Sequence, residues 1–468
     1  MGILAAAGEQ CDAAAAIFGE VQADRGFAAL QPQLRSGVLE LNAICAARAD
    51  RKEEALALTR RAVAEPRATA LGWGLHLALL SDLAGAEDVL SAFHTLARTR
   101  PELLKDLPDD TVRRVYALAS ERPNPEAERL SLLDDLRRAA YRPADPAEPG
   151  DDFTFEHARL LLAAGRTAEA REVARGLTSP FHLVALKVDS RLAPLRTGSG
   201  PLNIRTAAAP ALNDARGVLS ENTDRLSGVL RLAAHHLTLG EAETALRILD
   251  GAAARARRKG PGGFVDADAK LAQVHGMRGS AFDQLGRKDD ALSALAEAAA
   301  TPVSGSENVD GKITLAGYLV DLEKPTEVME VLSSIGAEDL SDHGRAWVAS
   351  MRACVHAQRR DTAAFRREMA LVEKPRQPPA YDALLNAQVC ANDLDAAAAT
   401  VIARLEDPSE RTYALVELQG YRNHPRYTAS GRRWQAGYDA LPARPDVRAA
   451  VVKAGGSLER FDIFAPLY

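Results

Sequence analysis

This sequence has few aromatic residues and no surplus of positive charge. Only 5% of its 468 residues are Phe, Trp or Tyr, and 58 basic residues stand against 64 acidic ones, giving a formal net charge of −6. Nucleic acids and anionic membranes are bound by concentrated basic surfaces, so this balance argues against both as partners. Hydrophobic residues still make up 47% of the chain. Such a composition, rich in Ala, favours closely packed helices over a β-sandwich, which needs β-branched and aromatic residues.

Cysteine is also scarce, and its spacing matches no metal site. The four cysteines are Cys11, Cys45, Cys354 and Cys390, with no CxxC pair among them. The sequence therefore predicts no metal and no cofactor. We expect all four to be ordinary thiols in a reducing compartment.

Long apolar runs are absent as well. No run reaches the roughly 20 residues that a membrane-spanning helix needs. Residues 1–17 lack the basic start and the long apolar stretch of a signal peptide. We therefore expect a cytoplasmic protein without membrane insertion.

A recurring phrase predicts a short helix, a tight turn and a second helix. It reads GRTAEA at 165–170, GEAETA at 240–245 and GRKDDA at 286–291, with looser copies at 50–55 and 392–397. Gly, Asp or Asn at the turn tolerates a left-handed backbone at the end of the first helix. A small residue in each first helix lies twelve positions before one in the second, at Ala43/Ala55, Ala158/Ala170, Ala233/Ala245 and Gly279/Ala291. Small residues let two antiparallel helices approach closely.

Proline supports the same register, because it stops a helix. It falls about eleven residues after the second-helix position, at Pro66, Pro101, Pro302, Pro375 and Pro408. The combined pattern resembles the tetratricopeptide repeat (TPR) family, in particular its bacterial members. The resemblance implies an all-α, right-handed superhelical solenoid of about ten antiparallel helix pairs. The Trp and Tyr of the family consensus are mostly missing, so related helical repeats with longer units stay an alternative.

The pattern divides the chain into four parts. We expect N-terminal repeats at 1–141, a Pro-rich acidic linker at 142–152, central repeats at 153–419 and closing helices with an aromatic tail at 420–468. Capping of the last repeat is the simpler interpretation of that tail, and docking to a partner is the alternative.

The first repeat is truncated, since residues 8–13 already match a turn and a second helix. Either this is a half-repeat cap, or sequence precedes it. In the second case a signal peptide or a further domain comes first, and a periplasmic location is open.

Motifs for chemistry are weak. His235 and His236 are adjacent, so on a helix they point about 100° apart and cannot face one metal ion. The Gly-rich stretches at 198–200 and 260–263 lack the strand context of a phosphate loop, and no GxSxG elbow occurs. The sequence therefore predicts a protein without enzymatic activity.

The family resemblance implies a scaffold that binds a protein or peptide in a concave groove lined by first helices. Its candidate contacts are the polar and aromatic first-helix residues Phe155, Arg159, His235, His236, Gln273 and Asp283. The alternative is a regulatory or sensor module of a larger enzyme or transcription regulator, which the truncated first repeat motivates. The oligomeric state stays open.

Overall fold

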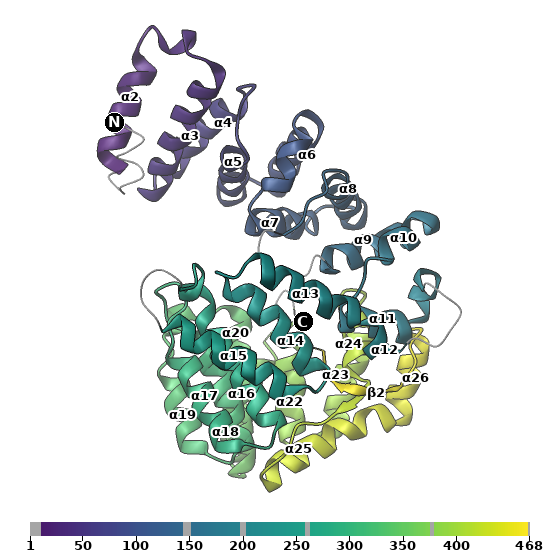
Figure 1. Ribbon diagram of the computed structural model, residues 1–468. Helices are drawn as coiled ribbons and strands as arrows, with labels where there is room; N and C mark the ends of the chain where they lie inside the picture. Colours follow the sequence, from purple (N-terminus) through teal and green to yellow (C-terminus); the bar gives the residue numbers. More distant parts are fainter. Residues whose placement is uncertain (1–10, 144–150, 197–202, 258–262, 375–378, 467–468) are drawn as a thin grey trace. The chain divides into compact units, whose positions relative to one another are not determined.

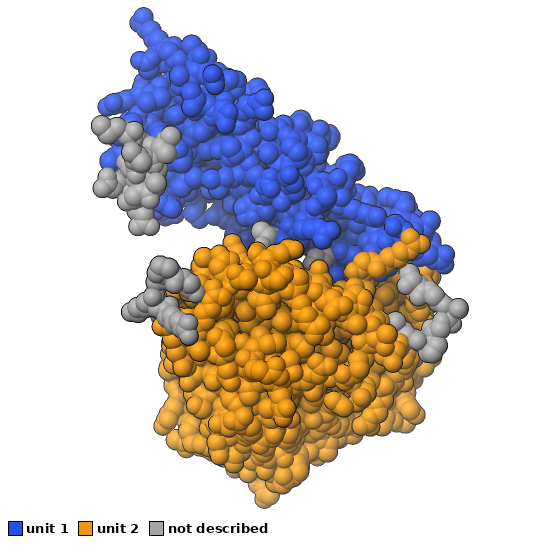
Figure 2. All heavy atoms as spheres, viewed as in Figure 1, with its two compact units in different colours: residues 1–174 blue, residues 175–468 orange. Residues whose placement is uncertain are grey.

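The computed structural model describes residues 11–143, 151–196, 203–257, 263–374 and 379–466. The chain forms two compact units, Met1–Ala174 and Arg175–Tyr468, shown in different colours in Figure 2. The division comes after residue 174, whereas the sequence predicts a linker at 142–152. Residues 144–150 of that predicted linker lie outside the described residues, and its last two residues begin a helix.

Unit 1 is built from consecutive helices (Figure 1). They are α2 (Cys11–Ala23), η1 (Phe27–Ala29), α3 (Pro32–Arg48), α4 (Lys52–Val63), α5 (Ala70–Leu83), α6 (Ala86–Thr99), η2 (Pro101–Asp106), α7 (Asp109–Ala119), α8 (Pro125–Arg138), α9 (Asp151–Ala163) and α10 (Thr167–Ala174). Each helix packs on its neighbour in the chain, and the first helices α3, α5 and α7 also contact one another in succession. This is the contact pattern of a helical solenoid.

Unit 2 begins irregularly and then becomes periodic. Its helices are α11 (Pro180–Val188), η3 (Ser190–Leu195), α12 (Ile204–Ala207), α13 (Ala209–Glu221), α14 (Leu226–Thr238), α15 (Ala242–Ala256), α16 (Ala267–Gln284), α17 (Lys288–Ala300), α18 (Val309–Asp321), α19 (Pro325–Ser333), η4 (Ala337–Asp339), α20 (Asp342–Gln358), α21 (Thr362–Val372), α22 (Tyr381–Cys390), α23 (Leu394–Glu406), α24 (Arg411–Glu417), α25 (Ala429–Ala440), η5 (Leu441–Ala443) and α26 (Pro445–Lys453). Its two strands, β1 (Gly420–Arg422) and β2 (Arg460–Phe464), pair in parallel. In the periodic part the first helices are α14, α16, α18, α20 and α22.

The predicted turns have the expected left-handed backbone. The φ angle is positive at each of them, at 57° for Asp50, 77° for Gly165, 76° for Gly240, 74° for Gly286 and 58° for Asn392. At the third turn of this series, the Glu241 N–H donates to the carbonyl of His236 at 2.8 Å, and the Gly240 N–H donates to that of Leu237 at 3.0 Å. This pair of bonds satisfies carbonyls that the end of an α-helix leaves without partners.

The proline pattern agrees with the helix ends. Helices α4, α17 and α23 end two or three residues before Pro66, Pro302 and Pro408, and Pro101 begins the short helix η2. Pro375 lies outside the described residues.

The small-residue spacing marks the helix crossings. Each of the four predicted pairs is buried, and all six Ala residues on α3/α4, α9/α10 and α14/α15 are 0% exposed. At Gly279 on α16 a Cβ atom would lie 2.7 Å from Cγ of Leu295 on α17, so a larger residue would push the two helices apart. The predicted all-α fold of stacked helix pairs is therefore confirmed.

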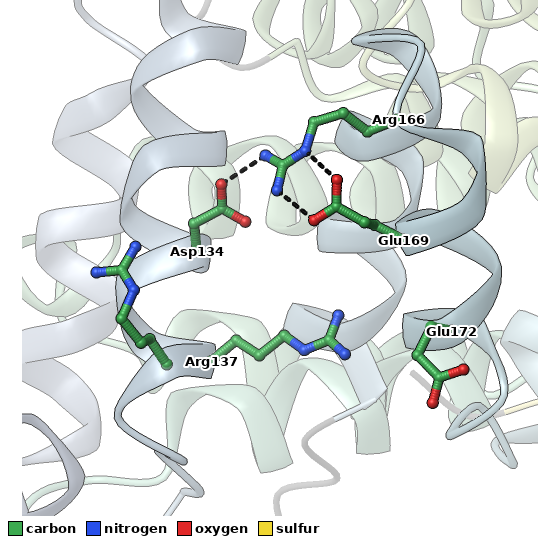
Figure 3. A pocket seen from close by; sticks show the side chains of 6 residues that line it. Asp134, Arg137, Arg166, Glu169 and Glu172 are labelled. Atoms are coloured by element: carbon green, nitrogen blue, oxygen red, sulfur yellow. Dashed lines mark hydrogen bonds and ion pairs between the residues drawn. The ribbon is translucent and has the colours of Figure 1, made fainter.

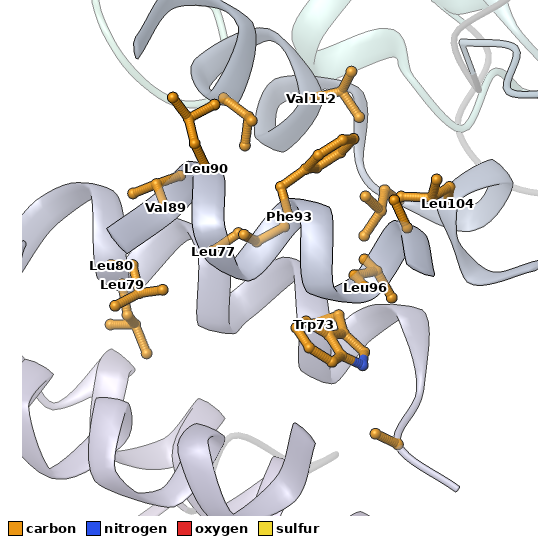
Figure 4. Packing of buried hydrophobic residues seen from close by; sticks show 14 of the residues in the cluster. Trp73, Leu77, Leu79, Leu80, Val89, Leu90, Phe93, Leu96, Leu104 and Val112 are labelled. Atoms are coloured by element: carbon orange, nitrogen blue, oxygen red, sulfur yellow. The ribbon is translucent and has the colours of Figure 1, made fainter. Parts of the chain in front are cut away.

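A continuous apolar core runs through most of unit 1, from Leu39 to Leu160 (Figure 4), and a smaller cluster joins Ala14, Phe18 and Cys45. Phe93, Leu77 and Leu96 are completely buried between α5, α6 and the elements that follow, and Trp73 packs close to them. Burial of this apolar surface supplies most of the stability of such a unit, because each helix pair alone leaves its inner face exposed.

The end of the chain returns to the beginning of unit 2. The Ser190 N–H donates to the carbonyl of Gly455 at 2.8 Å, and the Ser457 N–H donates to that of Val188 at 2.9 Å. Lys187 and Glu459 form an ion pair of 2.6 Å in the same region. Helix α11 also contacts α24. Unit 2 is thus closed on itself, and residues 420–466 are held against it at this end.

One sequence prediction is wrong. Cys354 on α20 and Cys390 on α22 are joined by a disulfide, with a Cα–Cα distance of 5.2 Å. They are separated by 36 residues, about one repeat, so the stacking of successive first helices brings them together. Cys11 and Cys45 are free thiols, as expected.

Candidate partner-binding site

The two predicted contact residues of unit 1 both lie on α9. Phe155 is buried, with 8% of its surface exposed. Arg159 forms a two-point ion pair with Glu156, with N–O distances of 2.7 and 2.8 Å, and also reaches Glu126 at 3.3 Å. The hydrogen bonds to Glu156 raise the pKa of this guanidinium above its ordinary value. A partner that used Arg159 would therefore compete with two carboxylates of the protein.

Three further predicted residues lie on α14 and α16 of unit 2. His236 is buried, and its Nδ1 lies 2.7 Å from a carboxylate oxygen of Glu241 across the turn. His235 is half-buried, and Gln273 is exposed on α16. His236 thus fixes the turn after α14, while Gln273 is open to solvent.

Asp283, the sixth predicted residue, is the centre of a polar cluster. It lies at the end of α16 with only 14% of its side chain exposed. One of its oxygens accepts hydrogen bonds from the hydroxyls of Tyr318 and Tyr427, each at 3.1 Å. The other lies 2.8 Å from Nδ1 of His424. Two of these three neighbours belong to the segment after β1, so the end of the chain supplies them.

We name residues 420–434 the C-terminal arm. The arm continues from Asp283 across the end of the next first helix. Arg426 forms an ion pair with Asp321, the last residue of α18, and the Thr428 hydroxyl donates to the Asp321 carbonyl at 2.6 Å. The Ser430 N–H then donates to Glu323 at 2.7 Å. The turn before α25 and the first residues of this helix are therefore held by side chains and carbonyls at the ends of other helices.

The arm ends on α20 and α22. The side-chain amide of Gln358 donates to the Ser430 hydroxyl at 3.1 Å, and the indole N–H of Trp434 donates to Asn386 at 3.1 Å. Arg426 also lies over the Trp434 ring, 5.2 Å from its centroid. We name the residues that receive the arm the helix-end surface: Asp283, Tyr318, Asp321, Glu323, Gln358 and Asn386.

Burial controls the electrostatics of this surface. It raises the pKa of Asp321 above the ordinary value of a carboxyl group, although the charge of Arg426 opposes the shift. Burial and the negative charge of Asp283 likewise raise the pKa of Tyr318, and raise that of Tyr427 to about 12. Both phenols therefore stay protonated at neutral pH and donate their hydrogen bonds to Asp283.

A second polar feature lies in unit 1, between α8 and α10 (Figure 3). It is an open cavity of about 360 Å³ lined by three arginines and three carboxylates: Asp134, Arg137, Arg138, Arg166, Glu169 and Glu172. Arg166 bridges Asp134 at 2.6 Å and Glu169 at 2.7 Å. The pair with Asp134 joins α8 to the start of α10, and the opposite charges of the lining offset one another.

A third cluster is buried near the end of unit 2. The guanidinium of Arg404, 3% exposed, pairs with Asp382 at 2.8 Å, Glu417 at 2.6 Å and Glu410 at 3.2 Å. Burial and the negative charge of Glu417 raise the pKa of Asp382. Because the four charges come from α22, α23, α24 and the turn before α24, the cluster ties these elements together.

Within the described residues, no group of three or more His, Cys, Asp or Glu side chains is placed to hold a metal ion. No helix in the same part of the chain is long and apolar enough to cross a membrane.

The sequence singles out Asp283 as a candidate but not the residues that it contacts. The aromatic enrichment after residue 420 pointed to Tyr427 and Trp434, yet not to the helices that receive them. The structure brings Asp283 together with the arm, and Phe464 of the same region lies against Gly240 at the end of α14. It places Phe155 and Arg159 in the other unit.

Helix pairs with left-handed turns and buried small residues recur in both units. The chain is a helical-repeat protein of stacked antiparallel helix pairs. No family model matches it, and no curated protein matches it either.

Among the solved structures similar to this chain, three illustrate the low level of identity. The crystal structure of the APC/C hetero-tetramer Cut9-Hcn1 has a TM-score of 0.31 and 13% identity, covering 97% of this chain and 88% of that one. The structure of Naa15/Naa10 bound to HypK-THB has a TM-score of 0.29 and 14% identity, covering 97% and 74%. The apo form of RapI has a TM-score of 0.35 and 10% identity, covering 87% and 98%. Similarities at this level assign no partner to the chain.

Proposed function

We propose that this TPR-like chain is a non-catalytic scaffold that binds a protein or peptide partner through its first helices. One observation carries the proposal: first helices of unit 2 hold another part of the chain, the turn after β1 and the first residues of α25, through side-chain hydrogen bonds and ion pairs. A peptide from another protein would be held by contacts of the same kind.

The candidate contacts keep the residues expected from the sequence and gain those of the helix-end surface. They are Phe155, Arg159, His235, His236, Gln273 and Asp283, together with Tyr318, Asp321, Glu323, Gln358 and Asn386. Asp283 belongs to both sets, which makes it the first position to test.

The test is affinity capture from the source cell with the full chain as bait, followed by mass spectrometry. We expect a stoichiometric partner whose recovery falls about tenfold with the Asp283→Asn/Asp321→Asn variant, since a lost charge-assisted contact costs roughly 1.5–3 kcal/mol. Asp289→Asn is the matched control, because the Asp289 side chain is 94% exposed. A second bait, Arg159→Ala, tests unit 1 separately.

Helicity measured by circular dichroism shows whether each bait is folded. Equal recovery of every captured protein by wild type, both variants and the control would contradict the proposed function.

A further inference from the structure

The helix-end surface is acidic, and the arm that lies on it is basic. Asp283, Asp321 and Glu323 contribute three carboxylates to this surface. The arm reads GYRNHPRYTASGRRW, with four arginines, one histidine and three aromatic residues but no Asp or Glu. Opposite charges on the two sides bring a segment to its site and fix its register.

The contacts are specific as well as complementary in charge. Asp283 accepts a hydrogen bond from the Tyr427 hydroxyl and lies beside His424, while Asp321 forms an ion pair with Arg426. The indole of Trp434 reaches Asn386 and covers the Arg426 guanidinium. A segment is thus recognised by an arginine and an aromatic ring at fixed spacing.

The arm is attached mainly by its surface. Every residue from 421 to 430 is exposed or half-buried, and Gly431 is the one buried residue of the arm. Large buried anchors lie outside it, such as Leu418 before it and Leu441 after it. Because the arm buries little apolar area and half-exposed ion pairs contribute little to folding, it can leave at the cost of the β1–β2 pairing and the first turns of α25, while its anchors and the helices below stay in place.

We propose that the helix-end surface is a binding site for basic, aromatic peptides, and that residues 420–434 occupy it in cis until a partner segment of the same chemistry displaces them. The proposal rests on the scaffold function above and specifies its partner. A partner that lacks an arginine and an aromatic residue at matching positions does not displace the arm.

The probe is a fluorescently labelled peptide of residues 419–436, added to the full chain and followed by anisotropy. The arm variant, Arg426→Ala/Tyr427→Ala, weakens the binding of the chain's own arm, which competes with the added peptide for the helix-end surface. We expect this variant to bind the peptide at least about tenfold more tightly than wild type, because apparent affinity scales with the fraction of open sites. Adding Asp283→Asn/Asp321→Asn to the arm variant abolishes binding. A peptide with Ala in place of its Arg426 and Tyr427 serves as the control probe.

Two results would overturn the proposal. One is a folded arm variant that binds the peptide no better than wild type, or binds the control peptide equally well. The other is measured on wild type and does not depend on a variant folding. The arm would be a fixed part of the fold if its amides at 421–430 exchanged as slowly as those of α18 and α22 and if excess peptide did not speed up their exchange. If the Asp283→Asn/Asp321→Asn bait still captured the partner and the Arg159→Ala bait did not, the scaffold function would stand and the peptide site would fail.

Discussion

Nδ1 of His424 lies 2.8 Å from a carboxylate oxygen of Asp283, although 141 residues separate the two in sequence. This contact joins the segment after β1 to the end of the first helix α16. With the Tyr427 hydroxyl on the other oxygen of the same carboxylate, Asp283 holds two side chains of the arm. A single acidic residue therefore couples the helical repeats to the end of the chain.

Replacement of Asp283 by Asn should release the arm locally. We expect faster hydrogen exchange at 421–430, since the amide has one acceptor oxygen where the carboxylate has two, and the negative charge that strengthens these contacts is lost. The global free energy of unfolding should fall by about 1 kcal/mol or less, as expected for partly exposed polar contacts. Asp289→Asn should change neither quantity. Unchanged exchange of the arm in the Asp283 variant would show that this carboxylate does not hold it.

Two glycines of α16 give a matched test of the helix crossing. Gly279→Ala places a Cβ 2.7 Å from Leu295, so we expect a loss of about 1–3 kcal/mol of stability from overpacking. Gly276→Ala meets no atom within 4 Å and should stabilise the helix by up to about 1 kcal/mol. Urea denaturation of the two variants measures both. Equal effects of the same sign would argue against a close crossing at Gly279.

The sequence predicted these crossings because their information is local. A small residue, a left-handed turn and a second small residue lie within about fifteen positions, as at Ala233, Gly240 and Ala245, and helix geometry then fixes how they meet. The start of unit 2 was harder to predict from the sequence, because α11 to α13 lack the recurring combination of small residue, left-handed turn and second small residue. Pro210 lies in the first turn of α13, where a missing N–H costs nothing.

Buried His76 should make unit 1 sensitive to acid. Its side chain is 6% exposed on α5, and its Nδ1 lies 3.0 Å from the Thr59 hydroxyl. Burial lowers the pKa of His76 to about 4. The neutral ring is thus favoured in the folded state, so its contribution is complete above about pH 6.5 and is lost as the pH falls toward 4.

The loss in that pH window should approach about 3 kcal/mol. His76→Gln should remove this part of the pH dependence, because Gln does not titrate. Denaturation of wild type and variant at pH 7, 5.5 and 4.5 measures the difference. Parallel stability curves for the two proteins would contradict the assignment.

Because Cys354 and Cys390 form a disulfide, only two of the four cysteines should react with a thiol reagent. Alkylation of the unfolded, unreduced chain should label only Cys11 and Cys45. Reduction should lower the free energy of unfolding by about 3–4 kcal/mol, the loop-closure value for a separation of this length. The Cys11→Ser/Cys45→Ser variant should respond to reductant as wild type does. Four reactive thiols before reduction would rule the bond out.

The candidate site was predictable only in part. Asp283 and Gln273 could be chosen because first-helix residues of a TPR-like repeat line one surface. The residues that meet Asp283, namely His424 and Tyr427, could not, since no local pattern relates a turn after β1 to a helix more than a hundred residues earlier. The spacing of Cys354 and Cys390 does carry a signal, since 36 residues is close to the length of one repeat.

Hydrogen exchange of the chain alone and in its captured complex tests most directly whether first helices bind the partner. We expect slower exchange at the ends of α16, α18 and α22 in the complex, together with faster exchange at 421–430 as the arm is displaced. Protection confined to the second helices α15, α17, α19 and α21, with the arm unchanged, would contradict the account.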